Sequence, residues 1–350
     1  MAINRVEIKD FLVFKGDFAV DFCPGVNVLI GGNATGKTTL LKVIYHSYCL
    51  FRGKPYGNKL MQTSSYSAIA DAYLSYFSRV NSDISPEIYS DVNGRSFVKE
   101  TKHNMFAIFF NLSSRDYHPP DEQNMRCLDI SAIYIPEKDI LEHAKGLLTF
   151  TEQKDTDFGR IYRDVLITAQ DVNTKKQSEM QEAISSNIAK TIGGKVEWTP
   201  SEGRYYTVRS DGARIPFANE ASGFKKLGYL ELLVRTGHLE SGSVLFWDEP
   251  ENSLNPELVP VLVDILLELS RNGVQIFLAT HSDFLCKWFE LKTGDGHNAD
   301  IEFFSLYKEN GTIRFKSSQS YTMLEHNSII DQSVELYNEH LRRATEHDED

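Results

Sequence analysis

One stretch near the start of the chain decides its fold: VNVLIGGNATGKTTL, residues 26–40. Its first five residues are mostly apolar and predict a buried strand. The pattern GxxxxGK[ST] follows from Gly31 to Thr38, and a helix is predicted from Lys37 to about Phe51. A strand, a glycine-rich loop and a helix in this order are typical of an α/β chain that cradles phosphate groups.

Each residue type in this loop has a chemical reason. Glycines let backbone N–H groups turn inward toward phosphate oxygens, and the start of the helix favours an anion. Lys37 is placed to reach the β- and γ-phosphates, and the Thr38 hydroxyl is placed to ligate Mg²⁺. The alternative is a glycine turn that matches the pattern by chance. The strand before the loop and the helix after it make such a chance match rarer. We therefore expect ATP to contact Gly31, Asn33, Ala34, Thr35, Gly36, Lys37, Thr38 and Thr39.

Two acidic residues follow a second apolar strand. Residues 244–247 read Val-Leu-Phe-Trp and lead directly into Asp248 and Glu249. A parallel strand that is buried on both faces delivers its last residues to the ligand edge of the sheet. There Asp248 would hold Mg²⁺ and Glu249 would polarise the attacking water. Two solvated acids that cap a strand are the alternative, which the phosphate loop disfavours.

A histidine follows a third apolar strand in the same way. Residues 274–279 are apolar apart from one glutamine, and Thr280, His281 and Ser282 come directly after them. At that edge the imidazole of His281 could donate a hydrogen bond to the γ-phosphate. A structural histidine is the alternative, and the position after an apolar strand favours the functional interpretation.

Composition limits the classes of partner and compartment. The net charge is −12, so contact with DNA or RNA would need a local basic patch. No apolar run reaches the roughly 18 residues of a membrane span, and the N-terminus lacks the pattern of a signal peptide. The four cysteines are scattered, as is usual for reduced thiols. We expect a cytoplasmic protein without a membrane partner.

The order of predicted elements indicates a core with one insertion. We expect residues 1–136 and 223–350 to form an α/β core, and residues 137–222 to form a mostly helical lobe. Helical patterns run over 137–150, 158–170 and 177–192, and residues 195–216 alternate like a hairpin. The lobe lacks sustained heptads, so no long coiled coil is expected.

These pieces in this order resemble the ABC ATPase superfamily, and in particular its soluble SMC, RecF and OLD branch. The opening pattern at residues 8–15, the run Asp248–Pro256 and the Thr280–Ser282 triplet carry the resemblance. The chain is most similar to short AAA family ATP-binding proteins that accompany bacterial anti-phage or toxin–antitoxin genes. The resemblance implies a P-loop NTPase of ABC type, with a mixed sheet, an antiparallel N-terminal β part and an inserted helical lobe.

The resemblance also implies a signature motif at residues 219–227, just before a helix. Ser222 and Gly223 would contact the γ-phosphate of ATP bound to the opposite subunit. The usual LSGGQ reads Ala-Ser-Gly-Phe-Lys here, so the second glycine and the glutamine are missing. Glu137 stands where a glutamine is common, which makes it a weak candidate for metal coupling. Lys225 and Lys226 are expected on a solvated face.

The implied assembly is a homodimer, or a higher even-numbered complex, in which two heads meet head to tail around ATP. After His281 the chain shows no nuclease motif, so we expect it to act on a protein effector in trans, in anti-phage defence. A RecF- or SMC-like DNA clamp is the alternative, with nucleic acid as a possible partner. The ATPase subunit of a membrane transporter is disfavoured by the altered signature.

Overall fold

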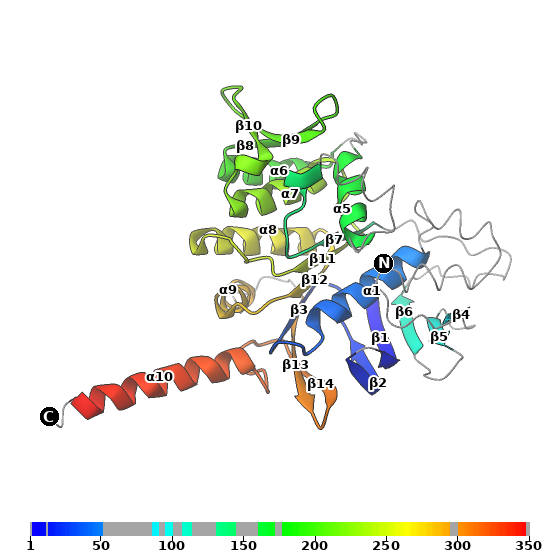
Figure 1. The fold of residues 1–350 in the computed structure, drawn as a ribbon, viewed down its shortest axis with the longest axis vertical. Coiled ribbons are helices and arrows are strands. Elements are labelled where there is room, and N and C mark those ends of the chain that lie inside the picture. Colours follow the sequence, from blue (N-terminus) through cyan, green and yellow to red (C-terminus); the bar gives the residue numbers. More distant parts are fainter. Residues whose placement is uncertain are drawn as a thin grey trace.

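A computed structural model describes residues 2–11, 13–51, 86–90, 95–100, 107–113, 131–144, 160–171, 177–294 and 300–347 (Figure 1). The strands are β1 (Ala2–Phe11), β2 (Phe14–Asp21), β3 (Val26–Gly31), β4 (Pro86–Ser90), β5 (Arg95–Glu100), β6 (Ala107–Ser113), β7 (Ala132–Ile135), β8 (Gly194–Thr199), β9 (Arg204–Arg209), β10 (Arg214–Pro216), β11 (Val244–Asp248), β12 (Gln275–Ala279), β13 (Ile301–Glu309) and β14 (Thr312–Ser318). The helices among the described residues are α1 (Lys37–Phe51), α5 (Arg160–Gln170), α6 (Glu179–Ile192), α7 (Ser222–Arg235), α8 (Val259–Arg271), α9 (Asp283–Gly294) and α10 (Ser328–His347). Short 3₁₀ turns are η1 (Leu141–His143), η2 (Phe217–Asn219) and η3 (Pro256–Leu258).

The central sheet has the strand order β14-β13-β3-β12-β11-β7. Its strands β13, β3, β12, β11 and β7 are parallel, and β14 pairs antiparallel with β13. A second, antiparallel sheet has the order β2-β1-β6-β5-β4, and a third has the order β10-β9-β8. The structure therefore confirms the mixed α/β fold with an antiparallel N-terminal part that the sequence predicts.

The central strands are buried on both faces, and alternate residues enter different apolar clusters. In β3, Val28 and Ile30 pack with the cluster that includes α7, α8 and α9, whereas Leu29 packs with the cluster that includes α1. Strand β11 alternates in the same way, with Trp247 on the first side and Phe246 on the second. Such strands do not face water, and the charged side chain that they carry, Asp248, comes at the end of β11.

One buried glutamine ties the two larger sheets together. Gln275 begins β12, and its side-chain Oε1 accepts a hydrogen bond from the N–H of Ile3 in β1 at 2.7 Å. Its Nε2 donates to the carbonyl oxygens of Ile3 at 2.9 Å and of Cys23 at 2.8 Å. The amide thus satisfies three backbone groups, which joins residues more than 250 positions apart.

The residues of the predicted lobe pack against α7 through a buried carboxylate. Glu231 of α7 is fully buried and accepts hydrogen bonds from the Ser185 hydroxyl of α6 at 3.0 Å and the Val196 N–H of β8 at 3.3 Å. Arg235 pairs with the same carboxylate at 2.7 Å. One apolar cluster runs from α6 through α7 into the central sheet. The division into a core and a lobe stays a prediction.

The start of this region differs from the prediction of a helix over 137–150. Residues 137–140 are not helical, η1 covers 141–143, and Ala144 is the first α-helical residue; residues 145–150 lie outside the described ranges. The Asp139 carboxylate accepts a hydrogen bond from the N–H of Leu141 at 3.1 Å. Such a bond from a side chain to the nearby backbone competes with helix formation. The predicted hairpin gains a third strand, β10.

Helix α10 leads away from the body of the molecule (Figure 1). Its side chains Val334, Leu336 and Tyr337 are each more than half exposed. Among the described residues, none of the helices combines the length and the apolar character that crossing a bilayer requires. Only the start of α10 reaches the apolar core among its described residues, through Ile329 and Ile330.

We expect the change Gln275→Leu to lower the free energy of unfolding by about 3 kcal/mol, because the buried N–H and carbonyl oxygen of Ile3 lose this partner, while the Cys23 carbonyl oxygen keeps its bond from Asn27. Urea denaturation followed by circular dichroism measures the loss. The control Gln319→Leu changes an exposed glutamine after β14 and should shift stability by about 0.5 kcal/mol or less. Equal midpoints for both variants would contradict the tie between the sheets.

Candidate functional site

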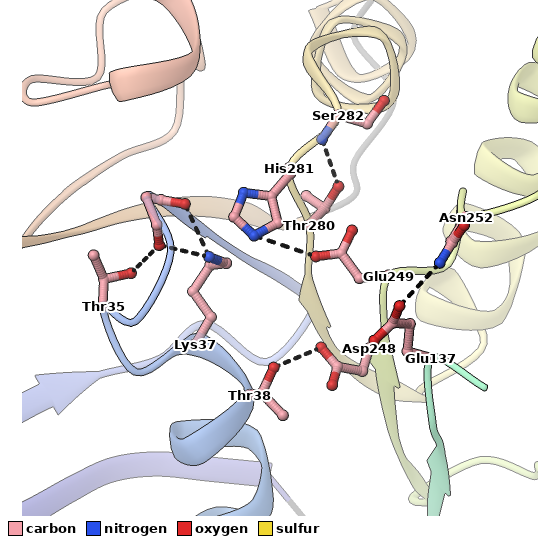
Figure 2. Close-up of polar contacts among 12 residues, drawn as sticks. Thr35, Lys37, Thr38, Glu137, Asp248, Glu249, Asn252, Thr280, His281 and Ser282 are labelled. Carbon is pink, nitrogen blue, oxygen red and sulfur yellow. Dashed lines mark hydrogen bonds and ion pairs between the residues drawn. The ribbon is translucent and has the colours of Figure 1, made fainter. Parts of the chain in front are cut away.

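The phosphate loop leaves β3 at Gly31 and ends at the start of α1. The Lys37 ammonium donates to the carbonyl oxygens of Gly31 at 2.8 Å and Gly32 at 3.0 Å, so it lies across the mouth of its own loop (Figure 2). The Thr35 hydroxyl donates to the Gly32 carbonyl oxygen at 2.9 Å, and Ala34 has a positive φ of 59°. These contacts hold the loop in a closed curve.

Glycine is required at the first position of this loop. Gly31 has a φ of +141°, and a Cβ there would lie 2.2 Å from the carbonyl oxygen of Leu306 in β13. That neighbour is backbone in a paired strand, so it cannot give way. Only a residue without a side chain lets the loop lie this close to β13, and such glycine-rich loops can turn their N–H groups toward a phosphate.

The end of β11 brings Asp248 to the loop. The Thr38 hydroxyl donates to Asp248 Oδ1 at 3.0 Å (Figure 2). The Tyr134 hydroxyl of β7 donates to Asp248 Oδ2 at 3.4 Å. Burial raises the pKa of Asp248, and the bond from Thr38 opposes the shift. A hydroxyl and a carboxylate side by side are the hard oxygen donors that Mg²⁺ takes beside phosphate oxygens.

The described residues contain no group of three or more His, Cys, Asp or Glu side chains that could cage a metal by themselves. Thr38 and Asp248 are the residues that the sequence predicts as Mg²⁺ ligands, and the structure places their side chains 3.0 Å apart. Their assignment remains a prediction.

Glu249 lies directly beyond Asp248 and faces His281. Its carboxylate Oε1 lies 3.5 Å from His281 Nε2. Burial raises the pKa of Glu249 to about 8, and the carboxylates of Glu251 and Asp248 act in the same direction. Burial and the Lys37 ammonium lower the pKa of His281, which favours its neutral form. In Figure 2 His281 lies between the phosphate loop and Glu249.

The loop after Glu249 is tied to two neighbouring strand ends. Asn252 donates to the Glu137 carboxylate at 3.1 Å, and Glu251 accepts a hydrogen bond from the Thr280 hydroxyl. Glu137 therefore contacts this loop, while Asp248 is held by Thr38 and Tyr134. Sequence reasoning did not single out Tyr134, because its place beside Asp248 depends on the pairing of β7 with β11.

The signature residues lie against the same loop from another side. Ser222 is exposed at the start of α7, and Gly223 is buried. A Cβ on Gly223 would lie 3.0 Å from Leu254 Cδ1 and 3.3 Å from the Ser253 carbonyl oxygen. Gly223 therefore packs closely on residues 253–254, and Ser222 beside it is exposed.

The expectation that Lys225 and Lys226 lie on a solvated face is wrong. They are 7% and 8% exposed, because each has an acceptor within the fold. Lys225 pairs with the Glu142 carboxylate, and the Lys226 ammonium donates to the backbone carbonyl oxygen of Glu249 at 2.6 Å. Both acceptors come from distant parts of the chain, so the local sequence carries no signal for them.

We expect Gly31→Ala to weaken nucleotide binding at least about tenfold, because the new Cβ must displace the loop or β13. Titration with a fluorescent ATP analogue measures the change. The control Gly311→Ala is also at a positive φ, 78°, but its Cβ would meet nothing within 4 Å. Equal affinities in the two variants would show that the close approach to Leu306 does not shape the site.

Short matches link the chain to DNA repair proteins. DNA replication and repair protein RecF of Oenococcus oeni is 51% identical over 45 residues, which is 13% of this chain and 12% of that protein. RecF of Lactobacillus gasseri matches with the same identity and coverage. The chain therefore matches only about an eighth of the length of these relatives.

A solved structure is similar over nearly the whole chain. The Smc head domain of Pyrococcus furiosus, solved with an extended coiled coil and bound to the C-terminal domain of ScpA, has a TM-score of 0.50 and is 12% identical. The match covers 97% of this chain and 99% of that chain. At this identity the likeness shows the fold alone, which is that of an Smc head domain.

A family match covers more than half of the chain. The family described as an AAA domain, putative AbiEii toxin, Type IV TA system matches residues 65–287. The matched range contains Asp248, Glu249 and His281 as well as the signature residues. The chain belongs to this AAA domain family and has the head fold of SMC-type ATPases.

Proposed function

We propose that this protein is a Mg²⁺-dependent ATPase that hydrolyses ATP to ADP and phosphate. One observation carries the proposal: the Thr38 hydroxyl and the Asp248 carboxylate meet at 3.0 Å where a phosphate loop, an acidic strand end and His281 converge (Figure 2). The loop and its helix supply N–H donors for phosphate oxygens. Family membership and the head fold support the same activity.

The side chains of the site have separate roles in this proposal. Lys37 binds the β- and γ-phosphates, while Thr38 and Asp248 hold Mg²⁺, which when bound offsets phosphate charge. Glu249 orients a water molecule whose oxygen forms a bond to the γ-phosphorus and whose proton passes to the carboxylate. The bond from that phosphorus to the bridging oxygen breaks. His281, neutral at its lowered pKa, donates a hydrogen bond to the γ-phosphate.

The active form in this proposal is a head-to-tail dimer around ATP. The exposed Ser222 and the resemblance to ABC heads support it, since a signature serine must reach the nucleotide of the other subunit. ATP binding then stabilises the dimer, and hydrolysis weakens it. Each subunit would place its Ser222–Gly223 pair against the phosphate loop of its partner.

The output of this cycle is proposed to be control of a protein effector in anti-phage defence. The family description names a putative AbiEii toxin and a type IV toxin–antitoxin system, which supports a defence setting. The similar Smc head is bound to a domain of ScpA, which supports a protein partner. The net charge of −12 disfavours nucleic acid as the main ligand.

A DNA clamp is the second candidate, favoured by the 51% identity with RecF proteins over 45 residues. Retention on duplex DNA at several salt concentrations separates the two functions. A clamp that contacts phosphates loses affinity steeply as salt rises, whereas an effector-directed ATPase shows no retention at low salt.

We expect Glu249→Gln to lower the hydrolysis rate about 100-fold or more, because a general base is lost. The same variant should accumulate as a dimer with Mg-ATP, which light scattering would detect as a doubled mass. The matched control Glu257→Gln alters an exposed carboxylate of η3 and should hydrolyse ATP at the wild-type rate. Wild-type hydrolysis by Glu249→Gln would remove the residue from the mechanism.

A further inference from the structure

A lysine of the signature helix binds the backbone of the proposed catalytic base. Lys226 lies in the second turn of α7, and its Nζ donates to the Glu249 carbonyl oxygen at 2.6 Å. The same oxygen accepts a hydrogen bond from the N–H of Asn252 at 3.1 Å. Lys226 is 8% exposed, so this contact is made inside the fold and not in solvent.

The Glu249 backbone needs such support. Its φ is +49°, in the left-handed region that residues with a side chain seldom adopt. Its N–H donates to the Ala279 carbonyl oxygen at 2.8 Å, so the peptide groups on both sides are held. The bond from Lys226 is charge-assisted and therefore stronger than the backbone bond from Asn252. Residues held in a sparsely populated conformation persist only where their surroundings fix them.

We propose that Lys226 is a positioning residue that links the start of α7 to the orientation of the Glu249 carboxylate. The inference rests on the proposed function, in which Glu249 orients the attacking water. It adds a series of contacts through which the Ser222–Gly223 pair of one subunit affects the orientation of Glu249 in the same subunit. Because Lys226 binds the main chain of Glu249, it acts through that residue.

A second contact makes the start of α7 and the acidic loop move together. Gly223 packs closely on Leu254 and Ser253, and Lys226 holds Glu249 one turn further along the helix. Residues 249–254 therefore contact α7 at both of their ends. A shift of Ser222 and Gly223 on meeting the partner's nucleotide is then transmitted to the peptide that carries the Glu249 side chain.

Burying an ammonium group costs free energy of solvation, which a residue that only fills space would not require. The buried charge of Lys226 therefore supports a role for its contact with Glu249. Burial lowers the pKa of Lys226, and the carboxylates of Glu251 and Glu137 oppose that shift. Lys225 offers a matched comparison on the same helix, because it is equally buried but pairs with Glu142 of η1.

The test compares Lys226→Met with Lys225→Met, each of which keeps the volume and removes a buried charge. We expect Lys226→Met to lower kcat at least about tenfold with KM and nucleotide affinity within about twofold of the wild type, because only the orientation of Glu249 changes. Lys225→Met should keep kcat within about twofold. Lys226→Arg should restore part of the lost kcat, since a charged donor returns.

If Lys226→Met does not fold, Lys226→Gln replaces it. The shorter glutamine side chain does not reach the Glu249 carbonyl oxygen, so we expect the same loss of kcat.

Steady-state hydrolysis, nucleotide titration and thermal midpoints give the readouts. An equal loss of kcat in Lys225→Met and Lys226→Met, or an unchanged kcat in Lys226→Met, overturns the positioning role. Wild-type protein and Glu249→Gln are measured in parallel. If neither the wild type nor Glu249→Gln hydrolyses ATP above a blank, the proposed ATPase activity is wrong. If the wild type is active, Glu249→Gln is inactive and the two lysine variants have the same kcat, the ATPase proposal stands and the positioning role of Lys226 is wrong.

Discussion

The burial of both faces of the parallel strands is the constraint on which the rest of the structure depends. Leu29, Phe246 and Phe277 point into one apolar cluster, and their chain neighbours point into the other. Polar groups can therefore leave the sheet only at strand ends, and parallel pairing collects those ends at one edge. The phosphate loop, the acidic pair and the histidine come from three different strands and meet for this reason. The order of the strands in the sheet therefore decides which side chains come together in the site.

Helix α7 has a second organising role. Its middle is anchored by the buried Glu231, which binds α6 and β8, and its start is anchored by Lys226 and Gly223 on the loop that follows β11. Helix α7 thus contacts α6 and β8 near its middle and the loop after β11 at its start. In the proposed role of Lys226, these contacts connect α7 to the Glu249 carboxylate, the proposed base.

The parts that could be predicted from the sequence are those with a local cause. The loop at 31–38 combines glycines, a lysine and a threonine in consecutive positions, and Asp248 follows a run of apolar residues, so both patterns are readable without knowledge of the fold. Lys226 looked like a solvated charge because its acceptor is the main chain of Glu249, 23 positions away. Gln275 binds Ile3 across 272 positions, which no local pattern can reveal. The predicted helix does not begin at Glu137, because the Asp139 side chain accepts a hydrogen bond from the N–H of Leu141, a local contact that helical periodicity does not reveal.

The place of β3 in the sheet also orders events during synthesis. The strand is near the N-terminus, but its two neighbours are β12 and β13, made of residues 275–279 and 301–309. Pairing between segments this far apart forms late, because a long loop of chain must close first. Until residues 275–309 have been translated, the nascent chain carries the phosphate-loop sequence without the two strands that flank β3. A product that is truncated before these residues would therefore hold the motif and lack the sheet that shapes the loop.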